Sequence, residues 1–243
     1  ILVNADIIEL SGRQCFLTVG IDVTERRRRE KIQAATYEIS QAVLGSNDLL
    51  TLLGKVHQII GTLVPAKNFY VSLLNADRSV ISFPYFVDER TPQPPSRPPR
   101  NGLTEFVIET RQPLLAGHEE IVGRLKSRGN YSPQGNPSAQ WLGAPLMVDG
   151  RCFGVIAVQD YHNPQAYTDD DMRLMLFVAE QTAAAIHRQQ VEAAQREART
   201  YFEKSFHSSP APMAITRITD GLITEANPAF LRVIDSTREE VIG

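Results

Sequence analysis

The apolar positions at the start of the chain alternate with polar ones, which is the pattern of a strand with one buried face. Residues 1–10 and 13–22 both follow it, and Ser11-Gly12 between them suits a two-residue turn. The pattern therefore predicts a β-hairpin. The chain begins inside the first of these runs and ends just after a helix-start signal, so we expect both ends to be truncated.

A change to helical spacing predicts a linker helix over residues 23–47. Asp22 and Glu25 have the spacing of a capping box, and neither Pro nor Gly interrupts the run before Gly45. Apolar residues in this helix recur at steps of three and four, the spacing with which helices pair side by side. We expect this seam to join a dimer through Ile32, Ala35, Ile39 and Ala42.

A second helix and a second hairpin follow. Residues 49–64 present one broad apolar face after a cap at Asn47 or Asp48. Residues 68–75 and 80–87 are rich in β-branched and aromatic residues and flank a polar turn, so they predict two paired strands.

Residues 91–100 change the character of the chain, because five of these ten residues are prolines. Proline has no backbone donor and fixes an extended φ, so the pattern predicts a surface loop or polyproline segment. We interpret this segment as a spacer that is dispensable for folding. The alternative is a docking strip for an aromatic groove of a partner.

The strongest hairpin signal lies in the middle of the chain. Residues 143–161 carry Asp149-Gly150 between two β-rich arms, and this pair is typical of a primed turn. Before it, residues 102–110 and 118–128 are predicted to form short helices on either side of an extended segment at 113–115.

A long helix is predicted from Thr168, which forms a capping box with Asp171, to Phe206. Its first half is apolar enough to cover a sheet. Its second half, the linker helix at 187–206, is polar except for apolar residues that recur at heptad spacing. A partner helix is needed to cover these apolar residues. We expect a parallel homodimer through this seam of Val191, Ala194, Ala198 and Tyr201.

Composition excludes several classes of protein. The 243 residues carry 25 Lys and Arg against 28 Asp and Glu, a net charge of −3, which argues against a nucleic-acid partner. No run approaches the roughly 20 apolar residues of a membrane span, so we expect no membrane contact within this chain. Cys15 and Cys152 form neither a disulfide framework nor a four-cysteine metal site, which fits a cytoplasmic location.

The sequence offers no catalytic motif. It contains no phosphate-binding loop, dinucleotide fingerprint, phospho-acceptor histidine box or G-G-D-E-F string, and no two of its five histidines have metal-ligand spacing. Cys152 lies in one arm of the predicted hairpin, where a free cysteine behaves as a small buried hydrophobe. We therefore expect neither catalysis nor a metal site.

The middle of the chain, assigned to residues 48–186, resembles a GAF domain. The resemblance lies in the order of a capped apolar helix, the Y-V-S-L-L strand, the G-A-P-L strand, the D-G-R-C-F-G-V-I-A-V hairpin and the helix after Y-T-D-D-D. It implies an α+β fold, with a GAF-like antiparallel sheet, helices on its faces and long helical linkers at both ends.

Both ends of the chain resemble parts of PAS domains. Residues 1–22, with the D-x-T-E-R motif that starts at Asp22, look like the C-terminal end of one. Residues 207–243 look like the N-terminal part of another, with Gly221 and Asn227 at its G and N positions. Such arrays are found as input regions of bacterial sensor histidine kinases of two-component systems and of cyclic-di-GMP enzymes.

Three ligand types known for GAF domains lack their motifs here. The GAF-family methionine sulfoxide reductase uses several clustered cysteines, and this domain has only Cys152. Covalent bilin binding requires a Cys followed by His, whereas Phe153 follows Cys152, and the N-K-x-F-D-E pattern of cyclic-nucleotide sites is absent. The cofactor stays unknown.

GAF domains bind small ligands in a cup between the sheet and short helices above it. We expect aromatic and aliphatic strand residues to line this cup. The candidates, led by Trp141, are Trp141, Phe69, Val71, Phe83, Tyr85, Phe106, Leu146 and Val155. The same set also fits an occluded core without a ligand.

These observations predict a non-catalytic sensory or regulatory input region of a bacterial signalling protein. Its GAF domain would sense a small ligand, or relay a conformational change through dimerising helices to adjacent PAS and output domains. The alternative is a ligand-free dimerisation and spacer module.

Overall fold

The computed structural model describes residues 2–10, 13–23, 33–34, 37–39, 41–42, 48–126 and 138–243. It divides into two compact units, Ile1–His187 and Arg188–Gly243. Within the described part of the chain, no helix is long and apolar enough to cross a membrane.

The first strands form the predicted hairpin. Strand β1 (Leu2–Leu10) pairs antiparallel with β2 (Arg13–Ile21), with Ile7 opposite Phe16. Both of these side chains are exposed, because the sheet contains only two strands. The predicted turn at Ser11-Gly12 lies outside the described residues.

Five antiparallel strands form the central sheet, in the order β4-β3-β7-β6-β5. Both predicted hairpins are present, and the expected α+β fold class is confirmed. Asp149 and Gly150, which join β6 to β7, both have positive φ, +48° and +74°, as a primed hairpin turn requires. The strands are β3 (Asn68–Leu74), β4 (Ile81–Val87), β5 (Leu114–Gly117), β6 (Gln140–Val148) and β7 (Arg151–Asp160).

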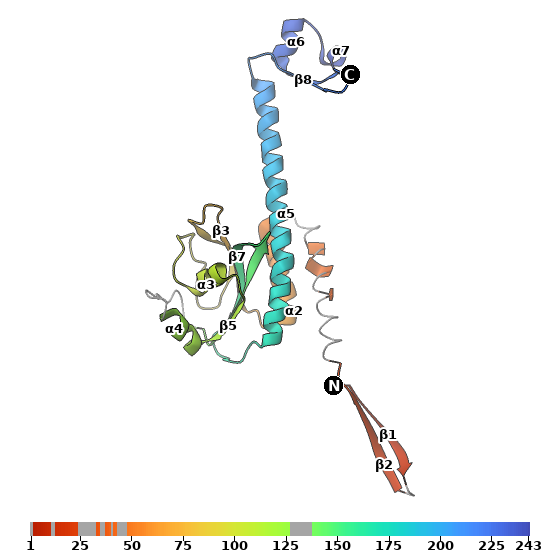
Figure 1. The fold of residues 1–243 in the computed structure, drawn as a ribbon, viewed down its shortest axis with the longest axis vertical. Coiled ribbons are helices and arrows are strands. Elements are labelled where there is room, and N and C mark those ends of the chain that lie inside the picture. The colour runs from red at the N-terminus through yellow and green to blue at the C-terminus, as the bar shows by residue number, and fades with distance from the viewer. Residues whose placement is uncertain are drawn as a thin grey trace. The chain divides into compact units, whose positions relative to one another are not determined.

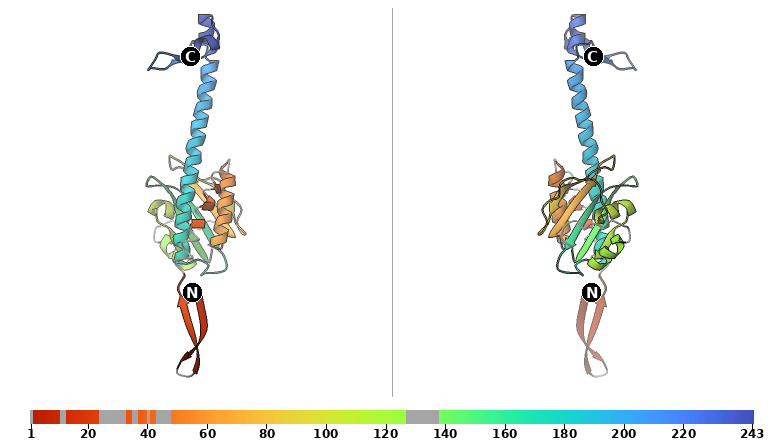
Figure 2. Two further views of the ribbon diagram at one scale, coloured as in Figure 1. Left: turned by 90° about the vertical axis from the view of Figure 1, so that its right-hand side faces the viewer. Right: turned by 90° about the vertical axis from the view of Figure 1, so that its left-hand side faces the viewer.

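Two long helices cover one face of this sheet, and a short helix covers the other. Figure 1 shows α2 (Leu49–Leu63) and α5 (Asp169–Ser208) on one side and α3 (Leu103–Thr110) on the other. In the left view of Figure 2, α2 (orange) and the first half of α5 (teal) lie next to each other over the sheet. Helix α4 (His118–Lys126) follows β5.

Side-chain caps begin the two long helices, as the sequence predicted. Of the two candidate caps for α2, Asp48 is the one used, because its carboxylate accepts from the Thr51 amide at 2.8 Å. At α5, the Thr168 amide donates to Asp171 at 2.8 Å and the Asp171 amide donates back to Thr168.

The sheet separates two hydrophobic cores. The helix-face core lies between the sheet and the pair α2 and α5, and contains Phe69, Leu142 and Ile156. The α3-face core lies on the opposite side and contains Tyr70 and Trp141. Successive residues of a strand point to opposite faces, so neighbours such as Phe69 and Tyr70 belong to different cores.

The predicted linker helix is described only in part. Ile39 and Ala42 are helical and buried in the helix-face core, so a single chain already covers them. Ile32 and Ala35 lie outside the described residues.

The second unit contains a two-stranded sheet and short helices. Its elements are the end of α5, β8 (Ala214–Thr216), β9 (Ile223–Ala226), α6 (Pro228–Ile234) and α7 (Arg238–Val241). Asn227 organises this unit, because its buried side chain caps α6 at Phe230 and donates to the carbonyls of Phe206 and Ala211.

Two glycines should respond oppositely to alanine. A Cβ at Gly154 of β7 would lie 2.3 Å from the Ser72 carbonyl oxygen of β3, whereas a Cβ at Gly61 of α2 would meet nothing within 4 Å. We expect Gly154→Ala to lower the free energy of unfolding by more than about 2 kcal/mol. Gly61→Ala should raise it by about 0.5–1 kcal/mol. Urea unfolding of both variants measures this, and equal effects would contradict the β3–β7 packing.

Candidate functional site

The eight residues predicted to line one cup lie on both faces of the sheet. Phe83, Phe106, Trp141 and Val155 belong to the α3-face core. Phe69, Val71, Leu146 and Tyr85 belong to the helix-face core or pack against it. The prediction of one cup lined by all eight is therefore wrong, because it joined residues that a close-packed sheet separates.

The α3-face core contains aromatic rings around a buried hydroxyl. The Tyr70 hydroxyl and Thr104 Oγ1 of α3 share a hydrogen bond of 3.0 Å. Phe83 and Phe86 of β4 lie beside the Tyr70 ring, with centroids 6.0 and 5.7 Å away. Tyr70 was not among the predicted residues. Its position next to Phe69 in an alternating strand was the available signal, because it places Tyr70 on the opposite face of the sheet.

Trp141 lies flat against its own strand. A Cβ at Gly143 would come within 2.0 Å of the Trp141 ring, so only glycine leaves room for the indole in this position. The Trp141 side chain is 2% exposed. Trp141 is therefore a packed part of the α3-face core.

Burial in this core shifts the acidity of Tyr70. Removal from water raises the pKa of the Tyr70 hydroxyl to about 12, and contacts with Thr104 and Trp141 oppose this only in part. The phenol therefore stays a neutral hydrogen-bonding group throughout the physiological pH range.

A buried ion pair borders the same core. Arg97 Nη1, from the proline-rich segment, donates to Glu105 Oε1 of α3 at 2.7 Å, and the two side chains are only 14% and 4% exposed. Glu105 also accepts from the backbone amides of Arg100 and Gly102. The Arg97 guanidinium lies 5.6 Å from the centroid of Phe83.

A polar cluster holds the other end of the proline-rich segment. Asp88 accepts from the amides of Arg90 and Thr91, and also from Gln159 and the Tyr161 hydroxyl. Burial, together with the Asp88 charge, raises the pKa of Tyr161 to about 12. The segment lies at the surface, as expected, but side chains at both ends hold it, so it is not the free spacer that its composition suggested.

A part-buried polar contact at His57 borders the helix-face core. His57 of α2 stacks on Phe69 with a centroid distance of 4.6 Å. Its Nε2 lies 2.7 Å from the Ala66 carbonyl oxygen, and since a carbonyl only accepts, this nitrogen donates. In the neutral ring, Nδ1 then accepts from the Tyr85 hydroxyl at 3.0 Å. His57 thus joins α2 to the sheet.

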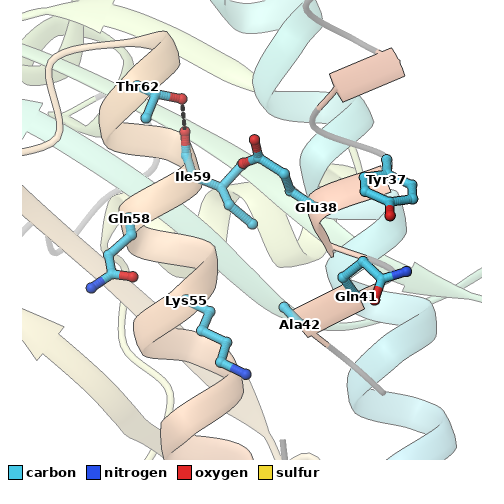
Figure 3. Close-up of a pocket in the computed structure, with 8 residues that line it drawn as sticks. All are labelled: Tyr37, Glu38, Gln41, Ala42, Lys55, Gln58, Ile59 and Thr62. Atoms are coloured by element: carbon cyan, nitrogen blue, oxygen red, sulfur yellow. Dashed lines mark hydrogen bonds between the residues drawn. The ribbon is translucent and has the colours of Figure 1, made fainter. Parts of the chain in front are cut away.

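An open groove of about 460 Å³ borders the helix-face core, since Ala42 and Ile59 of that core are among its lining residues. Figure 3 shows Tyr37, Glu38 and Gln41 on one wall, and side chains of α2, among them Lys55, on the other. Its lining carries both charge signs, and the groove is wide open to solvent. The groove therefore lacks the enclosed apolar surface that small-molecule sites present.

The described residues place no metal-binding cluster together. Among them, no three His, Cys, Asp or Glu side chains are close enough to hold a metal ion. Cys152 is buried in the α3-face core, where burial raises the pKa of its thiol, whereas Cys15 is exposed.

Comparison with known families identifies the sheet and its helices. A model of the GAF domain matches residues 46–187, which is more than half of the chain. The chain belongs to the GAF family. GAF domains are sensory and regulatory domains of signalling proteins. No curated protein sequence matches the chain.

Solved GAF structures share this fold at low sequence identity. The GAF domain of a Coxiella burnetii phosphoenolpyruvate-protein phosphotransferase is 15% identical, with a TM-score of 0.54 over 68% of this chain and 98% of that one. The corresponding Acinetobacter domain is 16% identical, with a TM-score of 0.52 over 68% and 95%. Free methionine-R-sulfoxide reductase from Neisseria meningitidis is 13% identical, with a TM-score of 0.53 over 71% and 96%. At these identities the likeness shows the fold alone.

The buried phenol of Tyr70 should make stability depend on alkaline pH. Its pKa is raised in the folded state, so the stabilisation is complete below the unfolded pKa near 10 and is lost as pH rises through 12. Relative to Tyr70→Phe, the wild-type free energy of unfolding should fall by about 2–3 kcal/mol between pH 9 and 12. Urea titrations of both proteins at each pH measure the difference, and parallel curves would contradict burial of this hydroxyl.

Proposed function

We propose that this chain is a sensory input region of a multidomain bacterial signalling protein, whose GAF domain binds a small ligand on the α3 face of its sheet. The observation that carries the proposal is the hydroxyl pair of Tyr70 and Thr104, enclosed by aromatic rings beneath α3. Burying polar groups in an apolar core costs free energy, whereas the same groups orient a bound ligand.

Four of the predicted ligand residues are consistent with this site. Phe83, Phe106, Trp141 and Val155 share the α3 face with Tyr70. A ligand there would be held by aromatic surface and by the hydroxyls of Tyr70 and Thr104. The remaining four candidates pack beneath α2 and α5 and serve the fold.

We further propose that α5 carries the signal as part of a parallel homodimer. Val191 and Tyr201 are 41% and 74% exposed in one chain, and Ala194 and Ala198 between them are exposed as well. A partner copy would cover this seam. The partial PAS domains at both ends, and a histidine kinase or cyclic-di-GMP enzyme as the parent, belong to the same proposal and rest on the sequence motifs.

The second candidate function is a dimerisation spacer without a ligand. It is favoured by the tight filling of the α3-face core, where Val155 and Val107 are fully buried and Trp141 nearly so. The two functions differ in one property, because only a sensor changes the surroundings of Trp141 when a compound is added.

Trp141 is the single tryptophan of the chain, so its emission reports on this site alone. We expect one class in a panel of free amino acids, nucleotides and aromatic acids to shift the emission of Trp141 and to raise the melting temperature. Tyr70→Phe should weaken that binding by about 1 kcal/mol, because one hydrogen bond is lost. If native mass spectrometry of freshly purified protein shows no bound compound and the panel changes nothing, the spacer function replaces the sensor.

The dimer is tested by charging its seam. Val191→Glu with Ala198→Glu should give a monomer in light scattering at about 100 μM, because buried carboxylates cost several kcal/mol each. Ala193→Glu with Thr200→Glu adds the same charges at the same spacing to exposed positions off the seam, and should leave the dimer intact. A monomeric wild-type chain, or equal loss of the dimer in both variants, would contradict the proposal.

A further inference from the structure

The proline-rich segment runs back along the edge of the sheet. We call residues 91–100 the strap. Strand β4 is an edge strand. The strap pairs with it at a single antiparallel bridge, where Ile81 and Arg97 exchange both backbone hydrogen bonds, at 2.8 and 2.9 Å. Gln93 adds one side-chain bond to the Phe83 carbonyl. With five prolines the strap offers few donors, so it cannot form a full sixth strand.

Between these attachments the strap is not packed against the sheet. A groove of about 490 Å³ lies between Ser82–Pro84 of β4 and Gln93–Ser96 of the strap. Pro84 also removes a donor from β4 at this place. Few contacts therefore oppose displacement of the strap, apart from those at its ends.

The two ends of the strap are held by different groups. At its start, Asp88 bonds the amides of Arg90 and Thr91 and is itself held by Gln159 and Tyr161. Near its other end, the Arg97 side chain donates hydrogen bonds to the Glu105 carboxylate and to the carbonyl of the adjacent Pro98. The first end is thus held by a cluster around Asp88. The second end is held around Glu105, which accepts from both the Arg97 side chain and the Arg100 amide.

The ion pair is also asymmetric. Glu105 Oε2 accepts from the Gly102 amide, and Glu105 lies in the first turn of α3, where the helix dipole favours a carboxylate. Glu105 keeps the Gly102 amide and the favourable helix dipole when Arg97 moves away. Arg97 loses the Glu105 carboxylate, but it lies on the strap, where its guanidinium can move into water.

A series of contacts between neighbouring side chains connects Arg97 to the proposed ligand site. Its guanidinium covers Phe83, Phe83 contacts Tyr70, and Tyr70 shares the α3-face core with Trp141. The strap is thus the peripheral cover of this core at the β4 edge.

We propose that the strap is a lid on the α3 face of the sheet, hinged at Asp88 and fastened by the Arg97–Glu105 pair, and that Arg97 is the moving half. The inference rests on the proposed ligand site, since it describes how that site becomes accessible. A lid opens while the rest of the sheet stays folded, which a purely structural strap does not do.

Hydrogen exchange of the wild-type chain tests this opening without any ligand. The amides of Ile81 and Arg97 each donate to the other residue's carbonyl and so join the strap to β4. They should exchange at least about 100-fold faster than the amides of the central strand β7, because a local opening needs less free energy than global unfolding. Their exchange should also depend little on urea. Equal protection and equal urea dependence for all of these amides would overturn the lid.

Variants test the fastening. Arg97→Met should accelerate exchange at Ile81 and raise acrylamide quenching of Trp141 severalfold, with β7 amides still protected. Arg151→Met, which removes the same charge from an exposed position on β7, should change neither. If Arg97→Met unfolds, Arg97→Lys keeps the charge with fewer donors and should show a smaller change in the same direction. An unchanged Ile81 amide in a folded Arg97→Met protein would overturn the ion pair as the fastening.

The two proposals can fail separately. Fast exchange at the strap with no responding compound in the panel would leave a lid over a core that binds nothing, and would refute the ligand site alone. A responding compound with a fully protected strap would refute the lid alone.

Discussion

The structure depends on strand β7, which buries both of its faces. Val155, Ile156, Ala157 and Val158 are all inaccessible to solvent. A strand in the middle of a sheet with no polar face requires an apolar cover on both sides, and each fully buried Val or Ile side chain contributes about 1.5–3 kcal/mol. Helices α2 and α5 provide one cover and α3 the other, so the three layers follow from four residues.

The same constraint explains how much of the fold the sequence predicted. Alternation, caps and turn pairs are local signals, and they located both hairpins of the sheet, α2, α3 and α5. Asp149-Gly150 is the clearest case, because two consecutive positive φ values demand such residues. The hydrophobic pattern also indicated which strands are buried. It did not indicate which core each residue joins.

Part of the error in the predicted cup, the grouping of Phe83 with Tyr85, has a specific physical source in β4. The register of β3 and β4 shifts between the pairs Val71–Tyr85 and Leu73–Ser82, so β4 carries one extra residue there. This bulge, which contains Pro84, sends Phe83 and Tyr85 to opposite faces although they are two residues apart. Proline is found at bulges because it cannot donate to a ladder. A bulge depends on the pairing of two strands, so it has no local signature in the sequence.

The layered arrangement also determines the route of any signal. A ligand on the α3 face would act from the opposite side of the sheet to α5, so its effect has to pass through side chains of β3 and β7. At Gly154 the backbones of these strands are too close to admit a Cβ, and residues of β7 contribute to both cores. Close-packed interiors transmit displacement because they have no space to absorb it.

Helix α5 packs on this layer through Met175, Val178 and Ile186, and no Gly or Pro interrupts it between Asp169 and Ser208. A shift of the central strands would therefore change the packing of the first half of α5 before it reached any partner of the second half.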